Sequence, residues 1–321
     1  MRSKPMASQL GPTVTAVAIA VGSVFFVAPT ATADTLPSVR SPSTVSDSCG
    51  TWSKTVVASG YGQLENLGFD GRGNLLLSEG SFVGPGAIHQ LGAAGNKSVV
   101  APDMTSPGGI VATDEVSYFT TGNSATAGLF DTADGTIEAL DPATGEVDTV
   151  VEGLTMPNGL AVLPDGRLVV SRDLGASTTL TVIDPDTGSK KTLAPSVTST
   201  NGLAWDSTRE LLWTSTLLSS VTTVVAIDVR SGKPVQTIEL PGIGWVNLAD
   251  DLTVGPDGAV YLALNAAGSV VRIDPDTSTS CVIADGVPLV SAVEFGAGPG
   301  WDATSLYATS FVGTLTRLTP R

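Results

Sequence analysis

The sequence predicts an all-β fold, a six-bladed β-propeller, from its composition and from an internal repeat. Of the 321 residues 36 are glycine and 20 are proline, 42% are hydrophobic and only 15% are charged. This composition is typical of many short strands joined by tight turns. It excludes a disordered chain, a coiled coil and a disulfide-dense miniprotein. The length could accommodate two ordinary domains, but one propeller also reaches this size.

The residues before the repeat are expected to direct export. Arg2 and Lys4 form a positive start, residues 14–27 are apolar, and Ala31-Thr32-Ala33 fits a cleavage site of small residues. We therefore expect a signal peptide over 1–33, a flexible leader rich in Ser, Thr and Pro over 34–48, and the propeller over 49–321. The protein is then secreted and extracellular.

The net charge indicates which classes of partner the protein can bind, and the two cysteines are consistent with the expected export. The net charge of −15 argues against nucleic acid and anionic membranes as partners. We expect a monomer that binds a small molecule. Export permits a disulfide between the two cysteines, Cys49 and Cys281, and the alternative is two free thiols.

An aspartate that ends one strand and begins a tight turn recurs along the chain. Asp141, Asp184, Asp228 and Asp274 are 43, 44 and 46 residues apart. A second mark of the same period is Asn-Gly-Leu-Ala, at 158–161 and 201–204. Each unit of about 45 residues is predicted to form four antiparallel strands, which is the size of a propeller blade. The competing β-helix has much shorter repeats.

The repeat predicts six blades, beginning near residues 65, 108, 158, 201, 250 and 291. The last blade has only three strands before the chain ends. The N-terminal segment 51–57 is expected to supply its fourth strand, which closes the ring and hides the sheet edges.

The first strand of each blade lines the central channel. The residues that occupy the same position of the repeat in successive blades are therefore expected to lie together at one mouth of the channel. This position is occupied in turn by Glu65, Gly108, Asn158, Asn201, Asp250 and Ser291. Carboxylate and amide oxygens suit a hard cation such as calcium, whereas zinc prefers histidine or cysteine. The only histidine, His89, is expected in a strand away from this mouth. The alternative is a water-filled channel whose polar residues only form turns.

Loops between the second and third strands are expected to open on the same mouth. They supply candidate substrate-binding residues beside Asn158, namely Asn123, Arg172 and Asn265, and Trp245 lies on the approach to Asp250.

Four segments resemble the SMP-30/gluconolactonase/LRE-like family, and the similarity extends over about residues 50–321. They are Glu65-Asn66-Leu67, Met156-Pro157-Asn158-Gly159, residues 199–205 with Asn201, and residues 249–263 with Asp250. The family consists of calcium-dependent six-bladed propellers that include sugar lactonases. The resemblance implies that Glu65, Asn201 and Asp250 hold calcium or another divalent cation, with Asn158 beside them.

The resemblance also implies that Asp250 is the general base. Asp251 stands where the family usually has glycine, so it remains open which of the two aspartates corresponds to the family's aspartate. Met156 replaces an arginine that sugar lactonases of the family carry. This makes the site more apolar and weakens the expectation of a sugar lactone.

Two functions remain open on the sequence. The first is a secreted, calcium-dependent lactonase or esterase, in which the cation polarises the carbonyl and Asp250, with Asp251, activates water. The second is a non-catalytic extracellular propeller with a structural cation that binds a small molecule or a protein. A serine triad is not supported, because the chain has no Gly-x-Ser-x-Gly motif and one histidine.

Overall fold

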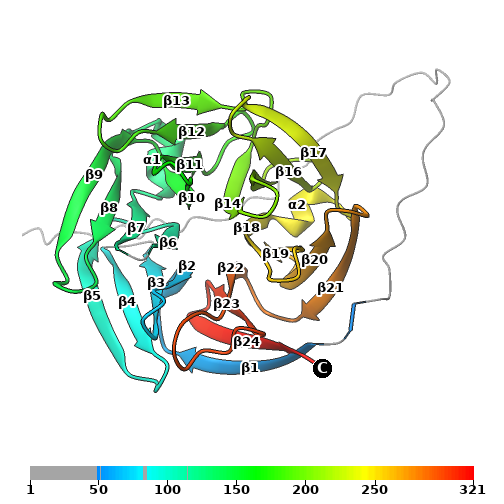
Figure 1. Ribbon diagram of the computed structural model, residues 1–321, viewed down its shortest axis with the longest axis horizontal. Coiled ribbons are helices and arrows are strands. Elements are labelled where there is room, and N and C mark those ends of the chain that lie inside the picture. Colours follow the sequence, from blue (N-terminus) through cyan, green and yellow to red (C-terminus); the bar gives the residue numbers. More distant parts are fainter. Residues whose placement is uncertain (1–48, 51, 82–84, 114) are drawn as a thin grey trace, which may run out of the picture. The chain divides into compact units, whose positions relative to one another are not determined.

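The computed structural model describes residues 49–50, 52–81, 85–113 and 115–321. The expected signal peptide and leader lie outside the described residues, as does Thr51. Within the described residues, six four-stranded antiparallel sheets are arranged as the blades of a β-propeller (Figure 1). This confirms the predicted fold.

The strands follow one another from the channel to the outside of each blade. Blade 1 contains β2 (Gln63–Phe69), β3 (Asn74–Gly80), β4 (Gly86–Gly92) and β5 (Lys97–Met104). Blade 2 contains β6 (Ile110–Ala112), β7 (Ser117–Thr121), β8 (Gly135–Leu140) and β9 (Val147–Leu154), with helix α1 (Ala125–Phe130) between β7 and β8. Blade 3 contains β10 (Pro157–Val162), β11 (Leu168–Arg172), β12 (Leu180–Ile183) and β13 (Lys190–Leu193).

The second half of the ring repeats this order. Blade 4 contains β14 (Thr200–Asp206), β15 (Leu211–Thr216), β16 (Thr223–Asp228) and β17 (Lys233–Glu239), and helix α2 (Gly244–Asn247) follows it. Blade 5 contains β18 (Ala249–Val254), β19 (Val260–Leu264), β20 (Ser269–Asp274) and β21 (Thr279–Asp285). Blade 6 contains β22 (Val290–Phe295), β23 (Leu306–Ser310), β24 (Thr314–Pro320) and β1 (Trp52–Ser59).

The ring is closed by its N-terminal strand, as the sequence predicts. Strand β1 pairs antiparallel with β24, with Trp52 opposite Pro320 and Ser59 opposite Thr314, and the two strands lie side by side in Figure 1. A disulfide joins Cys49, just before β1, to Cys281 in β21 of the neighbouring blade. The first and last segments of the ring are thereby fastened to each other.

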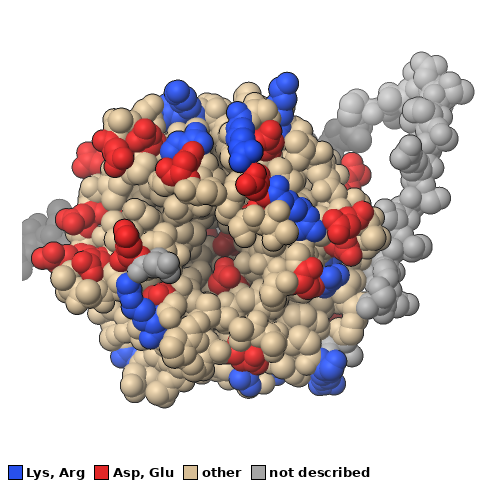
Figure 2. Space-filling model, in the orientation of Figure 1, with Lys and Arg blue, Asp and Glu red and all other residues tan. Residues whose placement is uncertain are grey.

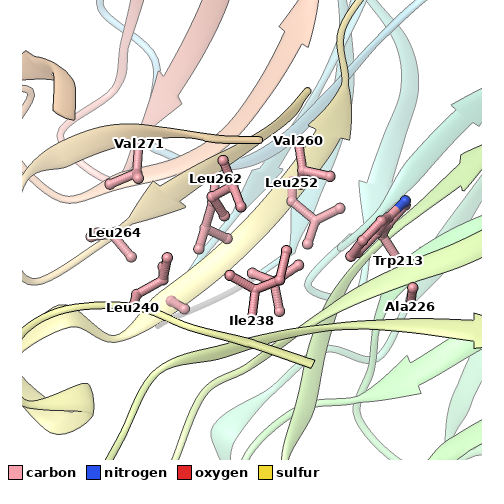
Figure 3. Close-up of a cluster of buried hydrophobic side chains, with 12 residues drawn as sticks. Trp213, Ala226, Ile238, Leu240, Leu252, Val260, Leu262, Leu264 and Val271 are labelled. Atoms are coloured by element: carbon pink, nitrogen blue, oxygen red, sulfur yellow. The ribbon is translucent and has the colours of Figure 1, made fainter. Parts of the chain in front are cut away.

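The core lies between adjacent blades. Between blades 4 and 5, Trp213, Ile238, Leu252 and Leu262 belong to one buried cluster (Figure 3). Each such side chain contributes about 1.5–3 kcal/mol when it is fully buried. Because every pair of blades has a face of this kind, the ring holds the channel-lining strands in fixed positions.

The recurring aspartates form the outer turns. The Asp184 carboxylate accepts hydrogen bonds from the backbone amides of Asp186 and Thr187 at 3.0 and 3.1 Å, and Asp274 repeats this pattern with Asp276 and Thr277. A short acceptor side chain is required for such a turn. These aspartates are structural, and the repeat that they mark is what places the channel residues.

The Asn-Gly pairs allow neighbouring innermost strands to approach each other closely. A Cβ built on Gly159 would lie 2.5 Å from the backbone oxygen of Asn201, and one on Gly202 would lie 2.5 Å from the Cα atom of Asp251. Only glycine fits at these positions without a backbone shift.

Substituting Gly159 by alanine should therefore lower the free energy of unfolding by at least about 1 kcal/mol and displace Asn201. Urea denaturation measures this effect. Gly50→Ala is the control, because its added Cβ would meet no atom within 4 Å. Equal stability of the two variants would contradict the close-approach argument.

Candidate functional site at the channel mouth

A cavity of about 310 Å³ opens where the innermost strands begin. It is lined by Glu65, Asp173, Asn201 and Asp250, among others. In the view of Figure 2 the ring is hollowed at its centre, and acidic side chains lie within the hollow. Among the described residues that line this cavity, none is lysine, arginine or histidine. The carboxylates therefore have no basic neighbour in the cavity wall.

Glu65 is held by two amides from other blades. Its Oε1 atom accepts hydrogen bonds from Nδ2 of Asn158 at 2.8 Å and from Nδ2 of Asn123 at 3.1 Å. Glu65 lies in β2, Asn158 in β10, and Asn123 just after β7. The side-chain NH₂ groups of Asn158 and Asn123 both donate to Glu65, so the side-chain oxygens of these two residues remain for other partners.

Two aspartates complete the acidic cluster. Asp250 in β18 is 6% exposed, and its Oδ2 accepts from Nδ2 of Asn265 at 3.3 Å. Asp173, just after β11, accepts from Nδ2 of Asn158 at 3.4 Å and from Nδ2 of Asn201 at 3.3 Å. We call Glu65, Asp173 and Asp250 the acidic cluster.

Burial and mutual repulsion make these carboxylates hard to ionise in the metal-free protein. Burial, and then the charge of Asp173, raise the pKa of Glu65 to about 8. Burial, and then the charge of Glu65, raise the pKa of Asp250 well above its usual value. Burial also raises the pKa of Asp173. A positive charge is the partner that would relieve all three.

The backbone just before these strands is left-handed. The residue two positions before the channel-mouth residue has a positive φ in five consecutive blades: Ser106 (40°), Met156 (45°), Ser199 (58°), Leu248 (44°) and Leu289 (50°). Such conformations cost about 1 kcal/mol or more for residues other than glycine and persist where the surrounding structure enforces them. They turn the chain sharply into the channel at the start of each strand.

The donor set fits a divalent cation that takes oxygen ligands. Within the described part of the chain, no group of three or more His, Cys, Asp and Glu side chains is arranged to hold a metal ion. A cation at the mouth would therefore use amide oxygens as well as carboxylates. The Oδ1 atoms of Asn201 and Asn123 are buried without a hydrogen-bond partner. Unpartnered buried oxygens beside buried carboxylates are the ligands that calcium accepts.

The structure brings most of the predicted residues to this mouth. Glu65, Asn158, Asn201 and Asp250, together with Asn123 and Asn265, form one hydrogen-bonded group or line the cavity. Two predicted substrate-binding residues do not line this cavity. The Arg172 guanidinium pairs with Asp131 at 2.8 Å and lines a different cavity, and Trp245 in α2 is 65% exposed.

Asp251 does not line the cavity of the acidic cluster, and it lies with Asp250 where the pairing of β18 with β19 shifts register between Ala249 and Leu252. It lines a second cavity of about 440 Å³, further along the same innermost strands, with Glu294. Its carboxylate accepts hydrogen bonds from Nδ2 of Asn66 at 2.5 Å and from the Leu203 amide at 3.2 Å. Burial raises the pKa of Asp251 to about 6 and that of Glu294 to about 7. Of the two aspartates, Asp250 is the one that shares a cavity with Glu65.

Asp173 is the member of the acidic cluster to which sequence reasoning gave no role. The repeat could have identified Asp173. Arg172 pairs with Pro157 in blade 3, and Leu264 pairs with Ala249 at the equivalent place in blade 5, so the residues that follow Arg172 and Leu264 correspond. Asp173 and Asn265 are therefore equivalent positions, and both hydrogen-bond at the mouth.

The loops around the mouth carry an exposed apolar surface. Of the 14 large hydrophobic side chains that are exposed in the described residues, five lie on outermost strands and the others lie in the loops on the mouth side. We call the latter the apolar rim: Leu129, Phe130, Leu174, Val221, Ile243, Trp245, Val246, Leu289 and Val312. Lone exposed apolar residues are ordinary, but their concentration around one opening indicates a binding face.

A six-bladed propeller with carboxylates and amides gathered at one channel mouth is the class of protein that these features define. The chain belongs to the SMP-30/gluconolactonase/LRE-like family, whose model, described as the SMP-30/Gluconolactonase/LRE-like region, matches residues 85–312. This match confirms the family resemblance. It includes Asn158, Asn201 and Asp250, whereas Glu65 precedes the matched segment.

Solved structures share the fold at low identity. A gluconolactonase from Xanthomonas campestris is 16% identical over 84% of this chain and 90% of its own, with a TM-score of 0.66. A calcium-binding protein, regucalcin, from Agrobacterium tumefaciens is 17% identical over 85% and 95%, with a TM-score of 0.63. A PQQ-bound aldose sugar dehydrogenase from Streptomyces coelicolor is 18% identical over 85% and 99%, with a TM-score of 0.61. These likenesses establish the fold alone.

No curated protein matches the chain in sequence. Among the helices of the described residues, none has the length and apolar character needed to cross a membrane.

Proposed function

We propose that the protein is a secreted, calcium-dependent hydrolase that opens lactones or related esters at the channel mouth. The observation that carries this proposal is the acidic cluster: Glu65, Asp173 and Asp250 line one cavity with two asparagines whose side-chain oxygens are unpartnered, and the described residues of its wall include no basic side chain. Family membership and the gluconolactonase and regucalcin likenesses support the same assignment. The Cys49–Cys281 disulfide supports export, since such bridges persist in oxidising environments.

Calcium would be held by Glu65, Asn201 and Asp250, with Asn158 beside them, and when bound it supplies Lewis acidity toward a carbonyl oxygen. Asn158 fixes the position of Glu65 through its 2.8 Å hydrogen bond, and Asn265 orients Asp250 in the same way. Asp250 would accept the proton of an attacking water and return it to the alkoxide that leaves when the ester C–O bond breaks. This assigns the general base to Asp250 rather than Asp251.

Replacing Asp250 by asparagine should lower kcat/KM for a lactone by about 100-fold or more, because the proton acceptor is lost. Asp251→Asn is the matched control. It neutralises the adjacent aspartate, which faces the other cavity, and should retain most of the activity. The assay measures lactone and aryl-ester hydrolysis by both variants and the wild type, with calcium and with chelator.

Full activity in folded Asp250→Asn would exclude this mechanism. If calcium raises the melting temperature of the wild type and no substrate is hydrolysed, the non-catalytic binding propeller is the correct assignment instead.

A further inference from the structure

The cavity walls beside the acidic cluster are largely apolar. Met156, Leu174, Leu217, Leu248 and Phe311 line the same 310 Å³ cavity as Glu65 and Asp250. They come from loops of four different blades, so the apolar lining is not a single stray contact. A ligand with its reacting group at the acidic cluster would rest against these side chains.

The backbone places three of these apolar residues at an energetic cost. Met156, Leu174 and Leu248 have φ values of 45°, 33° and 44°. Glycine or asparagine adopts this conformation more easily than methionine or leucine. Met156 and Leu248 occupy the repeat position that is left-handed in successive blades, so the blade geometry itself brings these two apolar residues to the cavity.

Helix α1 extends the apolar lining to the surface. A Cβ built on Gly128 would lie 2.3 Å from Sδ of Met156 and 3.6 Å from Cβ of Leu174, so α1 sits directly on both side chains. The next two residues, Leu129 and Phe130, are 77% and 73% exposed. Leu174 lines the cavity and is also 41% exposed in the apolar rim, so it connects the two, while Ser124, Ala125 and Thr126 at the start of α1 also line the cavity.

Several polar side chains at the cavity are already engaged within the protein. Asn123 donates to Glu65, and Asn265 donates to Asp250. The Ser124 hydroxyl accepts from the Ala127 amide at 3.2 Å as the N-cap of α1. These groups are poorly placed to replace the water around a ring that carries many hydroxyls.

We infer that the substrate is a lactone with an unbranched alkyl substituent, whose chain lies on Met156 and Leu174 and extends to the apolar rim at α1. This inference rests on the proposed function, because it names the substrate class of the same site. Each methylene group that is buried strengthens binding about 4-fold. Affinity and kcat/KM should therefore rise with chain length up to the reach of the rim.

Two measurements on the full chain with calcium test this inference separately from the proposed function. The first is calorimetric binding of δ-lactams, which resist hydrolysis, with methyl, butyl or octyl substituents. The second is hydrolysis of the matching δ-lactones and of a polyhydroxylated δ-lactone. We expect Kd to fall at least about 10-fold from methyl to octyl, and the octyl lactone to be hydrolysed at least about 10-fold faster than the polyhydroxylated one.

The variant Met156→Gln keeps the length of the side chain and makes it polar. It should reduce the octyl-to-methyl ratio about 10-fold. The control is Val235→Gln, on the outermost strand β17, where the side chain is 56% exposed. It should leave the ratio as in the wild type.

The outcomes are distinguishable. Chain-length-dependent lactam binding without turnover of any lactone would refute the proposed hydrolase and leave the ligand class intact. Lactam binding that is independent of chain length, or preference for the polyhydroxylated lactone, would overturn the inference even if the protein is a lactonase.

Discussion

Replacing Glu65 by glutamine should stabilise the metal-free protein and abolish the stabilisation that calcium confers. Without metal, Glu65 lies buried with Asp173 and Asp250, and burial and the Asp173 charge raise its pKa to about 8. Glutamine removes one charge from this group and can still accept from Asn123 and Asn158. We expect the unfolding free energy in chelator to rise by about 1–3 kcal/mol.

In calcium the order of stability should reverse. The loss of a carboxylate ligand should weaken calcium binding by two to three orders of magnitude, since ligand charge strongly tunes calcium affinity. Tight binding to the native state raises the melting temperature by mass action, so the wild type gains and Glu65→Gln does not. Scanning calorimetry with calcium and with chelator measures both effects.

The matched control is Glu138→Gln in β8. Glu138 is also buried, at 8% exposure, but its carboxylate accepts hydrogen bonds from Thr136 and Thr149 in blade 2. Its substitution should change stability by the same amount with and without calcium. Equal calcium responses of Glu65→Gln and the wild type would rule out Glu65 as a ligand.

The raised pKa of Glu65 also predicts how the unfolding free energy of the metal-free protein depends on pH. The pKa of Glu65 is raised from an ordinary value of 4.5 to about 8, so the native state binds this proton more tightly than the unfolded state does. The unfolding free energy should therefore fall as pH rises from about 4.5 to about 8. Glu65→Gln should lose this part of the slope.

The repeat made the channel residues predictable and left the loop residues uncertain. Asn158, Asn201 and Asp250 each begin an innermost strand, and the blade geometry carries equivalent positions to one axis. The direction of a side chain in a loop does not follow from the period of the repeat. For this reason the repeat could not show that Arg172, which was expected at the mouth, pairs with Asp131 instead. Trp245 likewise lies in the short helix α2, a local insertion that the other blades do not share.

The positions of Asp173 and Met156 could be found from the sequence, but their contacts are made between blades or with α1, and no local pattern records these contacts. Asp173 joins the acidic cluster through amides from β10 and β14, and Met156 reaches the cavity through a left-handed backbone and a contact with Gly128. The repeat position, by contrast, was available from the sequence, and the residue equivalent to Asn158 and Asn201 is Asp250. The register shift between Ala249 and Leu252 was not, and it is why simple strand alternation does not decide between Asp250 and Asp251.

Loss of the Cys49–Cys281 disulfide should destabilise the protein by about 2–5 kcal/mol, at the upper end for a bridge that spans 232 residues. The bridge fixes the start of β1 to β21, so β1 is held at its N-terminal end by a covalent bond and along its length by β24. In the unfolded chain it closes a loop that includes almost the whole propeller. Removing it enlarges the unfolded ensemble and allows β1 to fray from the ring.

Urea denaturation of Cys49→Ala/Cys281→Ala, compared with oxidised and reduced wild type, measures this loss. Reduced wild type should match the double variant, and each single variant should match both, because either change removes the same bond. Hydrogen exchange should accelerate most in β1 and at the β24 edge that it covers, while the innermost strands β10 and β14 keep their protection. An unchanged midpoint after reduction would mean that β1 pairing and blade packing close the ring without covalent help.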